Sequence, residues 1–281
     1  MPELPEVETV RKALAEVLEG RRLAHVETRR ADLRFPFPRG FAKKLTGCRV
    51  ESVGRRGKFL IIGLDDGLTL ISHLGMSGRY RIYLKTPPKL EKHDHVVFET
   101  ENGASIRFND PRRFGFMDLV KTAALATYPM LVKMGPEPLS NAFNGPVLAA
   151  ALKGRKAPIK AALLDQSVVA GIGNIYASEA LFRAGISPKR KAATVQGSRA
   201  EKLVLALRSV LIEAIAAGGS SLRDHRQPSG ELGYFQHAFA VYGRDGQPCP
   251  GCTCNPETGV GGIRRITQSG RSTFYCARRQ R

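Results

Sequence analysis

Long apolar runs are missing from this sequence of 281 residues. No stretch reaches the roughly 18 apolar residues that a membrane-spanning helix needs. The first eight residues, MPELPEVE, are acidic, whereas a secretory signal peptide begins basic and continues apolar. Internal repeats and low-complexity tracts are also missing. We therefore expect a soluble, intracellular protein that has no membrane partner.

Acidic residues are scarce beside basic ones. The 25 Asp and Glu face 44 Lys and Arg, a formal net charge of +19. Such an excess points to a polyanionic partner, because each phosphate neutralised by Lys or Arg releases condensed counterions. An anionic membrane surface is the competing interpretation, but no basic amphipathic helix with an apolar face stands out. The 42% of hydrophobic residues is ordinary for globular proteins, and the length suggests two domains.

Cysteine is rare in the body of the chain. Of five cysteines only Cys48 lies there, and the other four fall within the last 33 residues, namely Cys249, Cys252, Cys254 and Cys276. The odd count argues against a disulfide framework, and the cluster favours a metal site. A CxxC turn and a cysteine ending a strand-like segment can offer thiolates to one tetrahedral zinc ion. A metal-free hairpin with inert thiols stays open, and Cys48 is expected to be a buried small hydrophobe.

Hydrophobic spacing predicts the order of the elements. An amphipathic helix is expected over 5–19, with Gly20 as its stop. The next hundred residues hold short β-branched or aromatic segments between turns, the pattern of an antiparallel sandwich or barrel. Pro, Gly and Asn mark a linker near 131–150, after which helical patterns return. Residues 218–233 are rich in Gly, Ser and charge and predict a mobile loop.

The first residues offer a nucleophile. Removal of Met1 would leave Pro2 as a free secondary amine, and an α-amino group with a pKa of about 7.7 to 8.0 is roughly one-tenth unprotonated at neutral pH. Attack on an aldehydic sugar carbon would give an iminium. Glu3 and Glu6 would supply an acid and a positioning carboxylate. A plain helix start explains the same residues, because Pro and acids suit the first helical turn.

Other candidates are weaker one by one. The motif GIGNIYASEALF predicts a helix start at which Asn174 and the backbone N–H groups face a phosphate. Close packing at the glycines explains the same motif equally well. Arg112 and Phe114, in DPRRFG, offer a cation and an apolar wedge of the kind that unstacks bases, although a lone Phe is commonly a core residue. His93 and His95 sit at strand spacing and are read as polar contacts.

Eight motifs in order resemble the formamidopyrimidine-DNA glycosylases along essentially the whole chain: PELPEVETVR, GRRGKFL, HLGMSG, EKHDHV, NDPRRFG, GPEPL, GIGNIYASEALF and GRSTFYC. The related endonuclease VIII group opens with PEGPE, so PELPE favours the formamidopyrimidine branch. The resemblance implies a two-domain α+β fold: an N-terminal helix and β-sandwich (2–130), a linker (131–150), a helix-two-turn-helix bundle (151–237) and a β-hairpin zinc finger (238–281).

The resemblance also implies a function. It predicts a bifunctional DNA glycosylase and AP lyase that acts as a monomer on duplex DNA with oxidised purines, in the bacterial cytoplasm at the nucleoid. The damaged base, 8-oxoguanine or a formamidopyrimidine, would be flipped out of the stack. In the family Pro2 attacks C1′ and Glu3 donates the proton. Lys58 matches the lysine of β-elimination, and Arg271 matches the arginine of δ-elimination.

DNA contacts carry over in the same way. Residues that match the family's phosphate contacts are Lys58, His73, Asn174 and Arg271, and further DNA contacts match His93, Arg112 and Lys156. Residues that match those filling the hole left by the flipped base are Met76, Arg112 and Phe114. The loop 218–233 matches the segment that closes over the damaged base.

One motif departs from the family. The usual finger is CxxC, sixteen residues, CxxC, but Arg279 stands where the last Cys is expected, and twenty-three residues separate Cys252 from Cys276. A seven-residue insertion, 253–259, accounts for the spacing and brings Cys254 with it. We hypothesise that Cys254 replaces the missing ligand of one structural Zn²⁺. Three thiolates with another group, and no metal at all, are the alternatives.

Two other functions compete with the enzyme. One is a non-catalytic lesion or duplex binder of the same fold, and the other is a basic nucleic-acid protein of ribosomal type. A pure binder has no need of Pro2, Glu3, Glu6 and Lys58 together. A hundred-residue β domain fits the ribosomal type poorly.

Overall fold

The computed structural model describes residues 2–220, 228, 233–259 and 261–281. Their contacts form two compact units. Unit 1 comprises Met1–Val132 and Ala217–Tyr234, and unit 2 comprises Lys133–Ala216 and Phe235–Arg281. The domain boundaries given above stay predictions. The capping loop predicted for 218–233 falls for the most part outside the described residues.

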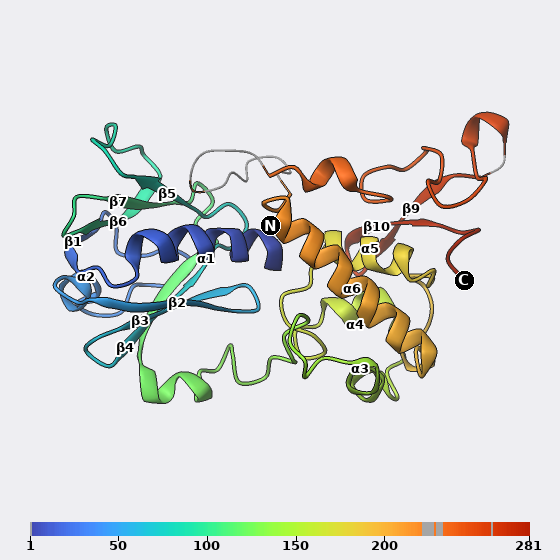
Figure 1. Ribbon diagram of the computed structural model, residues 1–281, viewed down its shortest axis with the longest axis horizontal. Coiled ribbons are helices and arrows are strands. Elements are labelled where there is room, and N and C mark those ends of the chain that lie inside the picture. Colours follow the sequence, from blue (N-terminus) through green and yellow to red (C-terminus); the bar gives the residue numbers. More distant parts are fainter. Residues whose placement is uncertain (1, 221–227, 229–232, 260) are drawn as a thin grey trace. The chain divides into compact units, whose positions relative to one another are not determined.

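Unit 1 begins with helix α1 (Leu4–Leu18), where the sequence predicts one. Its apolar side chains recur at helical spacing, and Val7, Val10, Leu14 and Leu18 are all at most 5% exposed. The helix ends as expected, because Gly20 takes the left-handed backbone at φ +74° that glycine adopts without steric cost. Figure 1 shows α1 (blue) lying alongside the strands, and it packs against β2 and β3.

Two antiparallel sheets of four strands form the predicted sandwich, in the orders β1-β6-β7-β5 and β2-β3-β4-β8. The strands are β1 (Leu23–Thr28), β2 (Val50–Arg56), β3 (Phe59–Leu64), β4 (Leu68–His73), β5 (Arg79–Tyr83), β6 (Asp94–Thr100), β7 (Ser105–Asn109) and β8 (Phe116–Lys121). The short helices are α2 (Phe41–Leu45) and η1 (Thr122–Thr127). Period-2 alternation explains the core: in β3, Leu60, Ile62 and Leu64 are buried while their neighbours are partly exposed.

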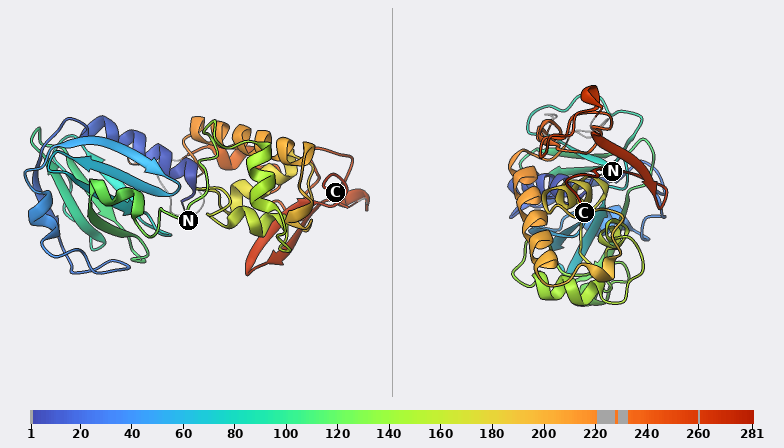
Figure 2. Two further views of the ribbon diagram at one scale, coloured as in Figure 1. Left: turned by 90° about the horizontal axis from the view of Figure 1, so that it is seen from below. Right: turned by 90° about the vertical axis from the view of Figure 1, so that its right-hand side faces the viewer.

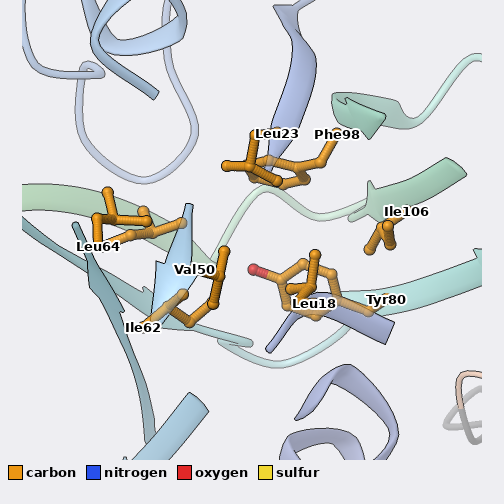
Figure 3. Close-up of a pocket in the computed structure, with 9 residues that line it drawn as sticks. Leu18, Leu23, Val50, Ile62, Leu64, Tyr80, Phe98 and Ile106 are labelled. Atoms are coloured by element: carbon orange, nitrogen blue, oxygen red, sulfur yellow. The ribbon is translucent and has the colours of Figure 1, made fainter. Parts of the chain in front are cut away.

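The sandwich interior is closely packed. A void of about 10 Å³ lies among apolar side chains that include Leu18, Val50 and Phe98, and Figure 3 shows them surrounding it. An ordered water needs about 10 to 15 Å³ and polar partners, so this void is a packing gap and not a ligand site. The nearby Tyr80 hydroxyl already donates to Ser72 Oγ, 2.8 Å away.

Cys48 lies at the edge of this core, 8% exposed, as the sequence predicts. Its thiol donates to the Lys44 carbonyl at 3.0 Å. Burial, reinforced by Asp66, raises the pKa of Cys48 to about 11. The thiol is therefore protonated at neutral pH and unreactive.

Unit 2 is helical and carries one hairpin. Its helices are α3 (Gly145–Leu152), α4 (Ile159–Leu164), α5 (Asn174–Arg183), η2 (Ala192–Thr194), α6 (Ser198–Ala216), η3 (Phe235–Ala238) and η4 (Pro256–Thr258). Helix α3 begins inside the range predicted as a linker. Helix α5 packs against α4, α6 and the last strand, and Figure 2 shows the hairpin (red) beside the helices of this unit.

The hairpin joins β9 (Ile263–Gln268) to β10 (Arg271–Cys276) in antiparallel register. Its turn residues Ser269 and Gly270 have φ +49° and +72°. Positive φ at both positions is the signature of a type I′ turn, which suits the twist of paired strands. Within the described part of the chain, every helix is too short or too polar to cross a bilayer.

Candidate active site

The start of α1 holds the predicted nucleophile and acid. Pro2 and Glu3 are both buried just ahead of Leu4. The Glu3 N–H donates to Glu6 Oε2 at 2.8 Å, and the Glu3 carboxylate accepts from the Glu6 N–H. This capping box fixes both carboxylates at the positive end of the helix dipole. The structure thus brings Pro2, Glu3 and Glu6 together.

Glu6 also reaches the first residues of the predicted capping loop, 218–233. Its Oε1 accepts from the Ser220 N–H at 2.8 Å and from the Ser220 hydroxyl at 2.9 Å. Gly219, at φ +80°, lies so close that an added Cβ would be 3.1 Å from Glu6 Oε1. One buried carboxylate therefore joins the helix start to residues 219–220.

Lys58 lies in the turn between β2 and β3 and is 8% exposed. Arg55 shapes this turn: its guanidinium donates to the Gly57 carbonyl and to Glu8 Oε2, both at 2.9 Å. The Arg55 and Glu8 side chains are only 10% and 15% exposed. This half-buried ion pair ties the Lys58 turn to α1.

His73 ends β4 between two aromatic rings. The registers place it opposite Phe59 and Phe116, whose ring centroids lie 4.8 and 5.5 Å from that of the imidazole. Burial, and then the positive charges of Lys58 and Arg34, lower the pKa of His73 to about 4. Its Nδ1 accepts from the Gly75 N–H at 3.0 Å, so the neutral ring carries its hydrogen on Nε2 and can donate it to a phosphate.

A buried carboxylate organises the loops after β4 and β7. Asp110 is 0% exposed. It accepts from the Ser77 hydroxyl through Oδ1 and from the Gly115 N–H through Oδ2 at 2.8 Å. Ser77 Oγ in turn accepts from the Arg112 N–H at 3.2 Å. At Gly75 the backbones touch, since an added Cβ would be 2.2 Å from the Phe114 carbonyl carbon.

These loops carry Met76, Arg112 and Phe114, which are predicted to fill the hole left in the duplex by the flipped base. Met76 and Phe114 are 42% and 43% exposed, so both apolar side chains are accessible at the surface. The Arg112 guanidinium lies 4.7 Å from the Phe114 ring centroid. His93 is half-buried beside them, and its carbonyl accepts from the Asp110 N–H.

His95 is a structural residue. It is 5% exposed, and its Nε2 lies 3.0 Å from the Asp110 carbonyl oxygen. Burial lowers its pKa. Its neighbour His93 is half-buried and is the more accessible of the two.

In unit 2, Asn174 is the first residue of α5 and is half-buried. Its side chain contacts the start of strand β10, because Asn174 Nδ2 donates to the Ser272 carbonyl at 3.0 Å. Arg271, at the tip of the same hairpin, is exposed. Lys156, ahead of α4, is exposed as well.

Three of the four C-terminal cysteines form a compact group, and the fourth, Cys254, lies beside two of them. The Sγ atoms of Cys249, Cys252 and Cys276 are all within 4.8 Å of one another. Cys254 Sγ lies 3.9 Å from Cys276 Sγ, and its N–H donates to Cys252 Sγ at 3.4 Å. Burial would raise the pKa of Cys252, but the Cys254 N–H and the neighbouring thiols bring it down to about 7. Soft sulfur donors at this spacing suit a thiophilic metal ion.

Arg279, at the position expected for the last cysteine, supports the CxxC turn instead. Its guanidinium donates to the Gly251 carbonyl at 2.9 Å and to the Phe182 carbonyl at 3.4 Å, and it lies 4.9 Å from the Phe182 ring centroid. This arginine therefore attaches the turn to the end of α5 and offers no metal ligand.

Two family models match the chain: the formamidopyrimidine-DNA glycosylase N-terminal domain over residues 1–117 and the H2TH domain of the same enzyme over residues 134–226. The formamidopyrimidine-DNA glycosylase of Rhodospirillum rubrum is 59% identical over 282 residues, which is 100% of both chains. The chain belongs to the formamidopyrimidine-DNA glycosylase family.

Solved structures of the family share the fold. The Lactococcus lactis Fpg in complex with DNA containing an abasic site is 34% identical at a TM-score of 0.86, covering 99% of each chain. A MutM structure in complex with DNA containing carbocyclic 8-oxo-G is 35% identical at a TM-score of 0.87, covering 100% of each chain. The predicted family, α+β fold and glycosylase enzyme class are confirmed. The roles of single residues stay predictions.

Three buried polar residues that the sequence analysis missed support this formamidopyrimidine-DNA glycosylase scaffold: Asp110, Lys160 and Glu179. Both Glu179 oxygens accept backbone N–H groups, from Ala240 at 2.9 Å and from Tyr242 at 2.8 Å among others. Glu179 and Lys160 each stand among apolar helix neighbours in the sequence. A charge at such a position is a signal of a buried, paired group, and it could have been found.

Proposed function

We propose that this chain excises 8-oxoguanine and ring-opened formamidopyrimidines from duplex DNA and then cleaves the strand at the abasic site. It would act as a monomer on the bacterial chromosome in the cytoplasm. Family membership supports the substrate class, since relatives of this fold bind DNA with such lesions. The observation that carries the proposal is the buried Pro2-Glu3 start, held by the capping box with Glu6.

Pro2 is the proposed nucleophile. After loss of Met1 its secondary amine attacks C1′ of the deoxyribose, and the electron pair of the glycosidic bond leaves with the base. The proton lost from the Pro2 nitrogen passes to the departing base, and Glu3 protonates the ring oxygen, so that the sugar ring opens and the iminium forms. Glu3 directly follows Pro2 in the chain and is buried with it, so its carboxyl group acts beside the nucleophile.

Strand cleavage follows from the iminium. Loss of a proton from C2′ expels the 3′ phosphate by β-elimination, and Lys58 is the residue proposed to assist this proton transfer. A second elimination then expels the 5′ phosphate, assisted by the Arg271 guanidinium. Iminium formation makes both steps easier, because the positive nitrogen draws electrons from the carbon that loses its proton.

The remaining residues would hold distorted DNA. Lys58, Asn174 and Arg271 supply charge and donors to the backbone phosphates, and neutral His73 supplies one N–H. His93, Arg112 and Lys156 are further contacts. Flipping a base costs a few kcal/mol of stacking, and Met76, Phe114 and Arg112 would offset it by filling the gap.

A nicking assay on duplex with 8-oxoguanine opposite cytosine tests the proposal. Wild type should nick the strand and form a covalent adduct under borohydride. Pro2→Gly should lose most of the adduct, and Glu3→Gln should lower the rate at least about 100-fold, the usual size of an acid–base contribution. Glu16→Gln, an exposed acid on the same helix, is the matched control.

Two results would overturn this mechanism. Mass spectrometry that finds Met1 retained on active protein would remove the nucleophile. Tight lesion binding with neither nicking nor adduct would favour the non-catalytic binder.

We further propose that Cys249, Cys252, Cys254 and Cys276 bind one structural Zn²⁺. In a tetrahedral site with Zn–S of about 2.3 Å the sulfurs lie about 3.8 Å apart. The separations of 3.6 Å between Cys252 and Cys276 and 3.9 Å between Cys254 and Cys276 suit that geometry. Bound zinc would orient the hairpin that carries Arg271, and it has no part in the chemistry at C1′.

Metal analysis of protein purified without added zinc tests the site. One equivalent is expected in wild type, and Cys254→Ala should lower the metal affinity at least about tenfold. Cys48→Ala, which removes a cysteine from unit 1, should leave the content unchanged. Full zinc retention in Cys254→Ala would show that three thiolates suffice, and no zinc in wild type would reject the site.

A further inference from the structure

A buried lysine connects one predicted phosphate contact, Asn174, to the hairpin that carries another, Arg271. Lys160, in α4, is 1% exposed. Its Nζ donates to Asn174 Oδ1 and to Thr273 Oγ1, both at 2.6 Å, and to the Ser272 carbonyl at 2.9 Å. These oxygens match the three N–H donors of an ammonium group. Burial of a charge is tolerated only with such partners, so this position is built around the lysine.

The same contacts orient the Asn174 amide. Its Oδ1 faces Lys160, and its Nδ2 donates to the Ser272 carbonyl at 3.0 Å with Tyr242 Oη at 3.4 Å. Lys160, Asn174 and Ser272 thus form a closed triangle of hydrogen bonds. Only one of the two amide orientations fits it, because an ammonium cannot accept from an NH₂ group.

The triangle also holds the hairpin. Ser272 and Thr273 directly follow Arg271 at the start of β10, and Thr273 is 0% exposed. The exposed Arg271 side chain is therefore held next to a backbone that Lys160 attaches to the first residue of α5. The helix N-terminus adds its own positive dipole end at this place.

We propose that Lys160 is a positioning residue for DNA binding: it holds the Asn174 amide and the base of the hairpin in one arrangement, so that Asn174 and Arg271 present their donors together to the DNA backbone. This inference rests on the proposed function. Lys160 is too deeply buried to touch a phosphate itself, so its effect passes through Asn174 and the hairpin. Its loss should weaken binding and leave the chemistry of the bound complex in place.

A double-mutant cycle tests this proposal. Affinity is measured by fluorescence anisotropy on an uncleavable duplex with a tetrahydrofuran abasic analogue, for wild type, Lys160→Met, Asn174→Ala and the double variant. Lys160→Met should weaken binding at least tenfold in the wild-type background and less than twofold when Asn174 is already Ala. A lysine that merely stabilises the fold would cost the same factor in both backgrounds, and that result would overturn the proposal.

Matched controls separate the causes. Lys202→Met removes an exposed lysine of α6 and should leave affinity within twofold. At saturating 8-oxoguanine duplex, Lys160→Met should keep kcat within about threefold while KM rises.

Thr273→Val is the second variant, for use if Lys160→Met does not fold. It removes one hydrogen-bond acceptor of Lys160 at nearly constant shape. It should weaken DNA binding by a smaller factor than Lys160→Met, and that factor should again shrink when Asn174 is already Ala. An unchanged affinity rejects the inference. Nicking of the 8-oxoguanine duplex by wild type is measured separately from the affinity cycle. Absence of nicking would contradict the proposed function, whereas equal affinity losses in both backgrounds would contradict only the role of Lys160.

Discussion

His73 illustrates at the scale of single residues how the surroundings select one form of an ionisable side chain. The imidazole lies between Phe59 and Phe116 and near the Lys58 ammonium, and burial and that charge lower its pKa to about 4. An unfolded histidine has a pKa near 6.5. Folding therefore favours the neutral ring, whose Nε2–H can donate a hydrogen bond at physiological pH without adding charge to the site.

The stability of unit 1 should depend on pH through His73. The folded pKa lies below the unfolded one, so this contribution is complete above pH 6.5 and is lost as the pH falls towards 4. Between these values the free energy of unfolding should drop by up to about 1.4 kcal/mol per pH unit from this group. Urea denaturation from pH 4.5 to 7.5 measures the slope.

His73→Asn keeps a polar side chain and removes the titration, so its slope should be shallower by that amount. His237→Gln, at an exposed histidine, should leave the slope unchanged. Equal slopes in wild type and His73→Asn would show that His73 titrates normally in the folded protein.

At the scale of elements, the loops after β4 and β7 act as one piece. Asp110 bonds both loops, and Gly75 lets their backbones touch. Met76, Arg112 and Phe114 owe their shared position to these contacts. Exposed apolar side chains keep a defined arrangement only when the backbone beneath them is fixed.

Gly75→Ala should disrupt this piece. The residue sits at φ +60°, and an added Cβ would lie 2.2 Å from the Phe114 backbone. Gly103 provides the control, because it has φ +85° with nothing within 4 Å of an added Cβ. Gly103→Ala should cost about 1 to 2 kcal/mol from the left-handed backbone alone, and Gly75→Ala at least about 2 kcal/mol more from overpacking.

Chemical denaturation measures the free energy of unfolding of both variants. The nicking assay shows whether the substitution also disturbs the predicted gap-filling residues Met76, Arg112 and Phe114. Gly75→Ala should also lower activity, while Gly103→Ala should not. Equal destabilisation by the two substitutions would mean that the contact at Gly75 is loose.

At the scale of the whole molecule, the net charge of +19 dominates encounter with DNA. Many of the Lys and Arg side chains are exposed. We expect long-range attraction to draw the duplex towards the protein, and the contact residues proposed above to decide how the duplex is held.

Salt dependence should separate these two kinds of charge. The logarithm of the association constant should fall linearly with the logarithm of salt concentration. Arg271→Met and Lys156→Met should each reduce the slope by about 1, the value for one lost contact between a cation and a phosphate, whereas Lys202→Met should leave it unchanged. Slopes measured by anisotropy between 50 and 300 mM salt give the answer, and equal slopes in all variants would remove both residues from the interface.

Patterns that are local in the chain already determine much of this protein. Alternating and helical hydrophobicity predicts α1 and most strands of the sandwich, since burial of one face is a local property of the sequence. The motifs around Pro2, Lys58, Arg112 and Asn174 suffice to identify the family. The cysteine spacing alone predicts a metal site.

Only the tertiary structure decides which polar groups become buried partners. Lys160 and Ser272 lie far apart in the chain, and nothing in either segment indicates that they meet. In the sequence Arg279 marks only the place of a missing cysteine ligand, and its hydrogen bond to the Gly251 carbonyl exists only in the folded chain. The reason is physical: a charged side chain is buried only where distant segments supply its hydrogen-bond partners, and those partners exist only once the chain has folded.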